Sequence, residues 1–166
     1  MRLLAFLTIA LAVGGCAARG AVPAPFPRPG DAPPRIPAAV EPIPDEHRQA
    51  IVSTALSLRG VPYRNGGSDP SGFDCSGFVA YVFGQQGHFV PRTVAEQFAL
   101  GDTIDSALVG PGDLVFFSTT APGPSHVGIA ISAAEFVHAP SSTGVVRVEA
   151  LGAPYWASRF LAARRP

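Results

Sequence analysis

The sequence has no lysine, a single methionine and only two cysteines. Its twelve arginines balance its twelve carboxylates, so the formal net charge at pH 7 is zero. Because neither sign is in excess, the charge indicates no nucleic-acid partner and no electrostatic steering of a charged one. Long apolar runs are also missing, since the run from Leu3 to Val13 has eleven residues, whereas a helix that spans a bilayer needs about 20.

The N-terminus has the organisation of a secretory signal peptide. Arg2 supplies a positive charge, an apolar run follows, and small residues precede Cys16. Val13-Gly14-Gly15-Cys16 resembles the bacterial lipobox, which predicts that residues 1–15 are removed and that Cys16 receives a diacylglycerol that anchors the chain to a membrane. Ala17 stands where an aspartate retains lipoproteins in the inner membrane, which favours the outer membrane, facing the periplasm, in a Gram-negative host. Ordinary secretion with a free Cys16 is the alternative.

Proline is concentrated after this segment, with nine of the 18 prolines between Pro23 and Pro44. A segment so rich in proline cannot bury enough apolar surface to offset ordering its backbone. We therefore expect residues 16–44 to form a lipidated tether that reaches at most roughly 85 Å. Residues 45–166 are expected to form one domain with one core.

Helical patterns come first within this domain. The first predicted helix is capped by Asp45 and closed by Gly60, and a turn-rich loop follows it. The second begins at Cys75, is capped by Asp74 and stops near Gly87.

A third, short helix is predicted from the capping box of Thr93 and Glu96 to about Gly101. From Gly112 the pattern changes to strands separated by turn residues, expected at 114–117, 126–131, 136–139, 145–148 and 159–163. Helices followed by an antiparallel sheet of about five strands predict an α+β domain with the helices packed against the sheet.

Cys75 is the only thiol that remains once Cys16 is lipidated, so it has no partner for an internal disulfide. The thiolate is the reactive form of cysteine, and the unpaired amides at the start of the predicted helix favour that anion. A nucleophilic cysteine also needs an imidazole that takes its proton and later gives it to the leaving amine. Cys75 is therefore the candidate nucleophile.

Four histidines are available as the base. We expect His47 and His88 to be solvated surface residues, whereas His126 and His138 lie in predicted strands, where an unpaired ring costs free energy. These two rings point to one face of the sheet if an odd-numbered loop such as 132–134 joins their strands, and to opposite faces if the loop is even-numbered without a bulge. A purely structural role for both histidines remains the alternative.

Metal binding and redox chemistry are weaker readings of the same residues. Cys75, His126 and His138 would give zinc three ligands without the closely spaced pairs of structural sites. A thiol-redox role lacks a Cys-x-x-Cys motif and a resolving cysteine. We therefore expect no metal and no cofactor.

The order of these motifs resembles the NlpC/p60 family of cysteine peptidases across residues 45–166. The resemblance is carried by Pro62-Tyr63, Gly66-Gly67, Phe73-Asp74-Cys75-Ser76-Gly77-Phe78, Pro91-Arg92-Thr93 with Gln97, Pro111-Gly112-Asp113-Leu114-Val115-Phe116-Phe117, Ser125-His126-Val127-Gly128-Ile129 and Phe136-Val137-His138-Ala139-Pro140. Asp-Cys-Ser-Gly is short by itself, but its combination with the later His-Val-Gly and His-Ala-Pro segments is specific.

The resemblance implies a papain-like α+β fold and a catalytic triad. In this triad Cys75 attacks, His126 acts as base and then as acid, and His138 orients His126. The resemblance also suggests that Tyr63 helps to stabilise the oxyanion, together with the backbone amide of Cys75, and that Ser76 lies near the substrate.

The implied function is that of a cell-wall hydrolase, a cysteine-type endopeptidase that cuts amide bonds in peptidoglycan stem peptides or in the cross-links between stems. Its expected partners are peptidoglycan and, through the lipid on Cys16, a membrane; no protein partner is indicated. A non-catalytic peptidoglycan-binding or envelope-assembly lipoprotein is the main alternative. Acyl transfer by the same residues is a second one.

Overall fold

The computed structural model describes residues 43–141 and 144–166. The predicted signal peptide, the lipidated Cys16 and the tether up to residue 42 lie outside these residues. Among the described residues, no helix is both long enough and apolar enough to cross a membrane. The elements follow the order α1 (Asp45–Ser57), β1 (Ser68–Asp69), β2 (Gly72–Phe73), α2 (Cys75–Gln85), α3 (Val94–Phe98), β3 (Asp102–Ile104), the 3-10 helix η1 (Ser106–Leu108), β4 (Leu114–Phe117), β5 (His126–Ala130), β6 (Glu135–His138), β7 (Arg147–Ala150), α4 (Pro154–Ala157) and β8 (Phe160–Arg165).

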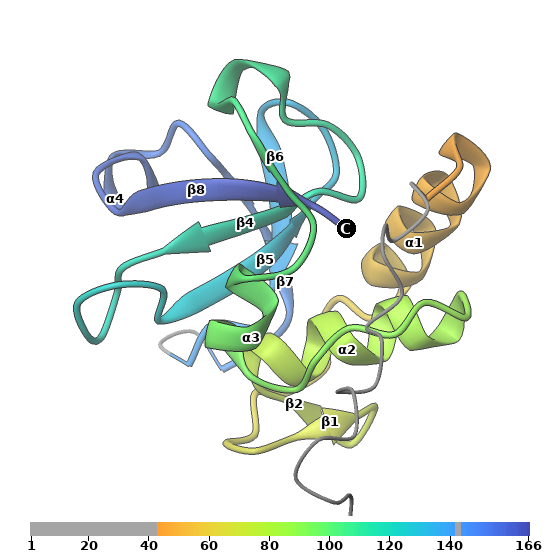
Figure 1. Cartoon of the computed structure of the whole chain (residues 1–166). Coiled ribbons are helices and arrows are strands. Elements are labelled where there is room, and N and C mark those ends of the chain that lie inside the picture. Colours follow the sequence, from red (N-terminus) through yellow and green to blue (C-terminus); the bar gives the residue numbers. More distant parts are fainter. Residues whose placement is uncertain (1–42, 142–143) are drawn as a thin grey trace, which may run out of the picture. The chain divides into compact units, whose positions relative to one another are not determined.

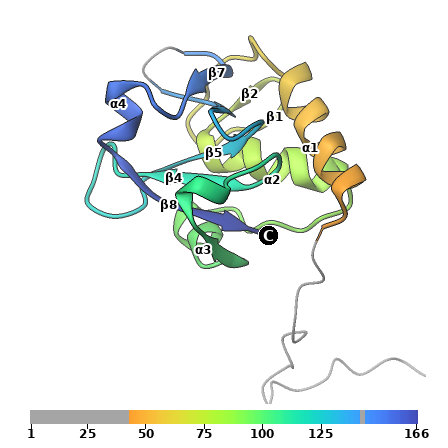
Figure 2. The same ribbon diagram turned by 90° about the horizontal axis from the view of Figure 1, so that it is seen from above.

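An antiparallel sheet of six strands forms the centre of the domain, in the order β3-β8-β4-β5-β6-β7. Helices α1 and α2 lie together on one side of this sheet, and the two-stranded hairpin of β1 and β2 lies next to α2 (Figure 1). Seen from above, α1 and α4 lie at opposite ends of the domain (Figure 2). The predicted α+β architecture, with helices packed against an antiparallel sheet, is confirmed.

Strand β4 shows why apolar side chains cover both faces of the sheet. Leu114 and Phe116 pack with residues of α1 and α2 in one apolar cluster, whereas Val115 and Phe117 belong to a second cluster that contains Trp156. All four β4 side chains are buried, as the alternation of a strand between two packed layers requires. The first cluster fixes α2 on the sheet, and the second supports the strands from the opposite side.

Two predicted helix starts are confirmed by their caps. Asp74 is the N-cap of α2, and its carboxylate accepts a hydrogen bond of 2.7 Å from the N–H of Gly77. Thr93 and Glu96 form the reciprocal capping box at the start of α3. In both helices a side-chain oxygen pairs with an amide that the helix itself leaves without a partner.

The start of α1 differs from the prediction. Pro44 is the N-cap, no side chain caps it, and Asp45 is instead the first helical residue. The N–H of Arg48 donates to the carbonyl of Pro44 at 3.0 Å, and Ile43 is already part of the core. Because Ile43 packs there, the chain enters the fold before the predicted boundary.

Several short elements went unpredicted because their residues carry no clear periodicity. Strand β3 pairs with the end of β8 as a sixth strand of the main sheet, although its side chains are mostly exposed. The β1–β2 hairpin lies inside the predicted loop, and α4 has only four residues. Strand β7 begins at Arg147, two residues later than expected, and α1 ends at Ser57, before Gly60.

A buried carboxylate links α1 to β8. Asp113 is fully buried and accepts hydrogen bonds from Arg48 Nη1 at 3.1 Å and from Arg165 Nε and Nη2 at 2.8 Å each. A carboxylate buried without such partners costs several kcal/mol. The three side chains therefore fasten the first helix and the last strand to the start of β4.

Candidate active site

Cys75 is the first residue of α2, and its side chain is half-buried. The backbone N–H of Val127, the residue after His126, lies near enough to the sulfur to lower its pKa, as do those of Ser76 and of Cys75 itself. Packing of α2 on β5 thus brings the candidate nucleophile to the strand that carries the candidate base. Among the described residues, no hydrogen bond joins the sulfur to the ring of His126 in this arrangement.

The environment of Cys75 favours the neutral thiol. Desolvation by burial raises the pKa of Cys75 above its ordinary value of 9.0, and the Asp74 carboxylate raises it further, while the three N–H donors lower it by less. The amides at the helix start favour the thiolate, as the sequence predicted, but two effects that the sequence did not reveal oppose them. Burial and the charge of the capping residue outweigh the amides, so attack requires a base that removes the thiol proton.

His126 and His138 are joined by a hydrogen bond of 2.7 Å between Nε2 and Nδ1, with ring planes 84° apart. The N–H of Ile131 donates to the carbonyl of Glu135 at 2.9 Å, which leaves residues 132–134 as the loop between the two strands. The loop is therefore odd-numbered, the condition that the sequence set for placing both rings on one face of the sheet.

Gly128 provides the space that His138 occupies. A Cβ atom at Gly128 would lie 2.6 Å from Cδ2 of Phe136 and 3.1 Å from Cβ of His138. Any side chain at this position would push β6 away from β5. The glycine two residues after His126 is therefore needed for contact between the two imidazoles.

Both imidazoles are neutral at pH 7. Burial lowers the pKa of His126 from 6.5 to about 4, and burial, followed by repulsion from His126 and Arg147, lowers the pKa of His138. A base that takes the thiol proton on Nδ1 of His126 must carry its own hydrogen on Nε2, which then donates to Nδ1 of His138. His138 then carries hydrogen on Nε2, a buried atom without a partner among the described residues. In this role His138 fixes the tautomer of His126.

Trp156 supports both rings. Its ring stacks on His126 with centroids 5.4 Å apart and planes 26° apart, and meets the edge of His138 at 4.8 Å. Its Nε1–H donates to Glu149 at 2.9 Å. Sequence reasoning missed Trp156 because α4 is too short to show a helical period; the signal that was available is that this is the single tryptophan of the chain.

Tyr63 and Ser76 are the residues predicted to contact the oxyanion or the substrate. Burial, followed by the charges of Cys75 and Asp74, raises the pKa of Tyr63, so the phenol is near enough to the thiol to interact with its charge, and the oxyanion contact stays a prediction. The predicted substrate contact of Ser76 also stays a prediction. Its side chain is 5% exposed, and its hydroxyl accepts a hydrogen bond of 2.9 Å from Arg92, so that interaction already occupies it.

Arg92 is a further residue of the site, which the sequence identified only as part of a motif. Its Nη1 and Nη2 donate to the two carboxylate oxygens of Asp74 at 3.0 and 2.6 Å. This bidentate pair places a positive charge against the carboxylate that raises the pKa of the thiol.

The remaining histidines lie on α1 and after α2. His47 is exposed, as expected, and His88 is half-buried, with His47 Nδ1 3.2 Å from His88 Nε2. Neither ring belongs to the site. Within residues 43–141 and 144–166, no three histidine, cysteine or acidic side chains are grouped as metal ligands.

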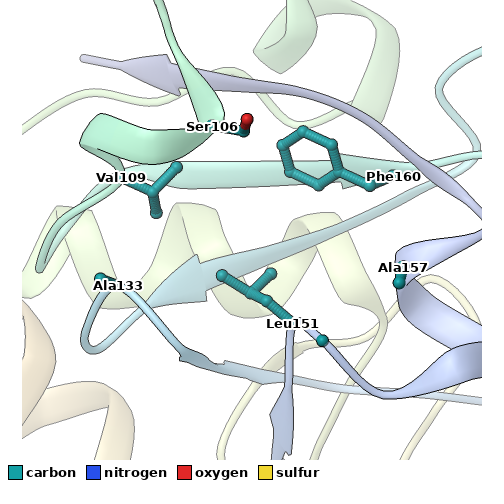
Figure 3. Close-up of a pocket in the computed structure, with 7 residues that line it drawn as sticks. Ser106, Val109, Ala133, Leu151, Ala157 and Phe160 are labelled. Carbon is teal, nitrogen blue, oxygen red and sulfur yellow. The ribbon is translucent and has the colours of Figure 1, made fainter.

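Two cavities have different surroundings. One of about 280 Å³ is lined by apolar groups including Val109, Leu151 and Phe160, with Ser106 as its one polar side chain (Figure 3). It contains neither Cys75 nor a histidine and so offers no nucleophile. A second cavity, of about 140 Å³, lies directly beside His126 and extends the candidate site.

The structure is an α+β domain in which a cysteine at a helix N-terminus and a hydrogen-bonded histidine pair lie on elements that pack together. The chain belongs to the NlpC/P60 family, whose sequence profile matches residues 60–165. It is 40% identical over 119 residues to the murein DD-endopeptidase MepS/murein LD-carboxypeptidase of Escherichia coli K12, covering 71% of this chain and 62% of that protein. The crystal structure of the NlpC/p60 domain of the peptidoglycan hydrolase SagA matches with a TM-score of 0.62 at 35% identity, covering 70% of this chain and 97% of that one.

The chain spans between 28% and 62% of the length of three curated relatives that it matches. The fold is also shared by RipD of Mycobacterium tuberculosis, described as a non-catalytic NlpC/p60 domain protein adapted to peptidoglycan binding. That structure has a TM-score of 0.61 at 21% identity, covering 72% of this chain and 96% of that one. At this identity the likeness concerns the fold alone.

Proposed function

We propose that this chain is a cysteine-type endopeptidase that hydrolyses amide bonds in peptidoglycan stem peptides or in the cross-links between stems. The names of its relatives support this class of substrate. The observation that carries the proposal is the meeting of Cys75 with β5 at Val127, next to a His126 ring that is hydrogen bonded to His138. These groups suit the roles of nucleophile, base and orienting residue.

Acylation starts from a neutral thiol and a neutral imidazole. Nδ1 of His126 takes the thiol proton while the sulfur of Cys75 attacks the scissile carbonyl carbon. The resulting oxyanion accepts hydrogen bonds from the backbone N–H of Cys75 and the hydroxyl of Tyr63. When this intermediate collapses, the C–N bond breaks, the imidazolium gives its proton to the departing amine, and a thioester remains on Cys75.

Deacylation uses water as the second nucleophile. His126, neutral again, takes one proton from water while the water oxygen attacks the thioester carbon. The C–S bond then breaks, the sulfur of Cys75 recovers the proton from His126, and the acyl half leaves as a carboxylic acid that ionises in solution.

The resting protonation states agree with this order of events. His126, with a pKa of about 4, is unprotonated at pH 7 and free to accept a proton. Proton transfer requires the sulfur to come within hydrogen-bond distance of Nδ1 of His126. Catalytic hydrogen bonds that are absent without substrate often form when the substrate binds.

The proposal extends to the location of the enzyme. Residues 1–15 as signal peptide, Cys16 as lipid anchor and residues 16–44 as tether would hold the domain in the cell envelope, at the outer membrane facing the periplasm if the host is Gram-negative. Support comes from the sequence Val13-Gly14-Gly15-Cys16. Incorporation of labelled palmitate that survives in a Cys16→Ala variant would contradict the anchor.

Cys75→Ala tests the proposed reaction. We expect the intact protein to release muropeptides from purified peptidoglycan and Cys75→Ala to release none, with an unchanged thermal unfolding midpoint. Ser106→Ala, which removes a hydroxyl from the remote apolar cavity, is the matched control and keeps full activity. Mass spectrometry of the products names the bond: a new carboxylate indicates hydrolysis and a new amide indicates acyl transfer. Release of muropeptides by Cys75→Ala would rule out the thiol as nucleophile.

A peptidoglycan-binding protein without catalysis is the second candidate function. The observation that favours it is the raised pKa of Cys75 together with the missing hydrogen bond from the thiol to His126. In that case the intact protein and Cys75→Ala would sediment with peptidoglycan to the same extent, and neither would release muropeptides.

A further inference from the structure

The cavity beside His126 has a polar wall and an aromatic wall. It is lined by the hydroxyl side chains of Thr119, Thr120 and Ser141 and by Tyr155 and Trp156, together with His126 itself. The cavity thus joins residues of the turn between β4 and β5 to residues of α4. Neither Cys75 nor Tyr63 lines it.

The proposed reaction indicates which half of the substrate this cavity would hold. The acyl half of the substrate becomes bonded to Cys75, and its oxyanion faces Tyr63. The amine half must receive its proton from His126 and therefore lies on the side of His126 away from Tyr63. The cavity is lined by His126 but not by Cys75, so its position suits the amine half.

Arg159 supplies a positive charge at the edge of this cavity. Its guanidinium carbon lies 3.9 Å from the centroid of the Tyr155 ring, and its Nη1 donates to the carbonyl of Tyr155 at 2.9 Å. Among the described residues, Nη2 of Arg159 makes no hydrogen bond. No acidic side chain lines the cavity. Glu149, which accepts from Trp156 at 2.9 Å, is itself paired with Arg147 at 3.1 Å.

Resting on the proposed function, we propose that this cavity is the subsite for the amine half of the substrate, and that Arg159 selects an amino acid that carries a carboxylate next to the amine released. Tyr155 and Trp156 contact the carbon chain of that residue. The hydroxyls of Thr119, Thr120 and Ser141 bind its polar groups.

Ser125 fixes the backbone of two residues that line the subsite. Its hydroxyl accepts hydrogen bonds from the N–H groups of Thr119 at 2.8 Å and Thr120 at 3.2 Å. Because Ser125 immediately precedes His126, the wall of the cavity and the catalytic base are fixed to one another. This coupling aligns the bound amine with the proton donor.

Tryptophan fluorescence tests the subsite without any need for hydrolysis. The chain has a single tryptophan, and Trp156 lines the cavity, so its emission reports occupancy. The Cys75→Ala protein is titrated with lysine and with lysinamide, which lacks the carboxylate. We expect the free carboxylate to bind about five- to tenfold more tightly, the effect of one charge-assisted contact at a half-exposed site.

Arg159→Gln should remove this preference and leave the affinity for lysinamide unchanged, whereas Arg59→Gln, at an exposed arginine after α1, should preserve it. Thr120→Val is the second variant and should weaken both probes by about threefold. Equal affinity for both probes, an unchanged preference in Arg159→Gln, or emission that does not respond to either probe would overturn the subsite. Because no bond is cut in this titration, its failure is distinct from a failure of the peptidase proposal.

Discussion

Asp74 affects the start of α2 in two opposing ways. As N-cap it accepts a hydrogen bond from Gly77 and stabilises the helix that presents Cys75. As a carboxylate beside the sulfur it raises the pKa of the same thiol. Arg92 reduces the second effect without losing the first, because it pairs with both carboxylate oxygens while the cap remains in place.

The reactivity of Cys75 toward an alkylating reagent should follow its raised pKa. Below the pKa the thiolate fraction rises about tenfold with each pH unit, so we expect the iodoacetamide rate to be low at pH 6 and still to be rising at pH 9. His126→Ala should change this profile little, because the resting thiol makes no hydrogen bond to that ring. A fast, pH-independent rate near pH 6 that disappears in His126→Ala would indicate a thiolate–imidazolium pair instead.

Arg92→Gln should leave the charge of Asp74 unbalanced and raise the pKa of Cys75 further. Arg92 is 42% exposed, so solvent screens the effect, and we expect about a three- to tenfold fall in the alkylation rate at pH 8. The double variant Asp74→Asn with Arg92→Gln keeps an amide that caps α2 and restores the rate. A double variant as slow as Arg92→Gln alone would show that position, and not charge, explains the loss.

At the scale of elements, the hairpin of β5 and β6 determines whether two histidines meet. The odd-numbered loop places His126 and His138 on one face, and Gly128 lets their strands approach. Trp156, which lies in α4, then stacks on the ring of His126. The base and its orienting residue are therefore products of strand register more than of local sequence.

Gly128→Ala should separate the histidine pair. The added Cβ would lie 2.6 Å from Phe136, so we expect overpacking to cost about 1–3 kcal/mol of unfolding free energy and hydrolysis to fall at least tenfold as His138 moves. Gly84→Ala is the matched control: Gly84 is in α2 and no atom lies within 4 Å of its added Cβ. Urea denaturation should show a stability gain of about 0.5–1 kcal/mol for that variant, with full activity.

The helix starts at Asp74 and Thr93 were predictable because capping residues act locally, within one turn. Strands β4, β5 and β6 were predictable because buried apolar residues mark them. Strand β3 was not, since it is held by backbone pairing to β8, distant in sequence, and its exposed side chains leave no pattern.

Within the site, too, local features could be predicted from the sequence, whereas contacts between distant elements could not. Motif and strand parity singled out Cys75, His126 and His138 as candidates. The contacts of Trp156, the hydrogen bonds of Arg92 and the burial of Ser76 depend on elements that meet only in the folded domain. The neutral state of the thiol was missed for the same reason: the helix N-terminus is readable from the sequence, but desolvation is not.

At the scale of the whole molecule, the two buried imidazoles make the free energy of unfolding depend on pH. Each binds a proton at about pH 6.5 in the unfolded chain, but burial lowers both pKa values in the folded domain, to about 4 for His126. The unfolded state therefore binds more protons as the pH falls below about 6.5. The contribution to stability is complete above that pH and is lost as the pH falls toward 4.

We expect the free energy of unfolding to fall on the order of 3 kcal/mol for His126 alone between pH 7.5 and pH 4. Guanidinium titrations of the intact domain and of His126→Asn check this, because the difference between their pH profiles removes the effect of the carboxylates. His47→Gln, at an exposed ring, serves as control and should follow the intact domain. Parallel profiles for His126→Asn and the intact domain would show that the ring is not buried in a neutral form.

The stability of the whole domain depends on an intact β8, because β8 supplies partners to the buried carboxylate of Asp113. Arg165 supplies two of the hydrogen bonds to this carboxylate, so an exopeptidase that removed Arg165 would leave Arg48 as its one remaining cation. Clipping of a few residues from β8 would then shorten the lifetime of the enzyme far more than the loss of an edge segment suggests.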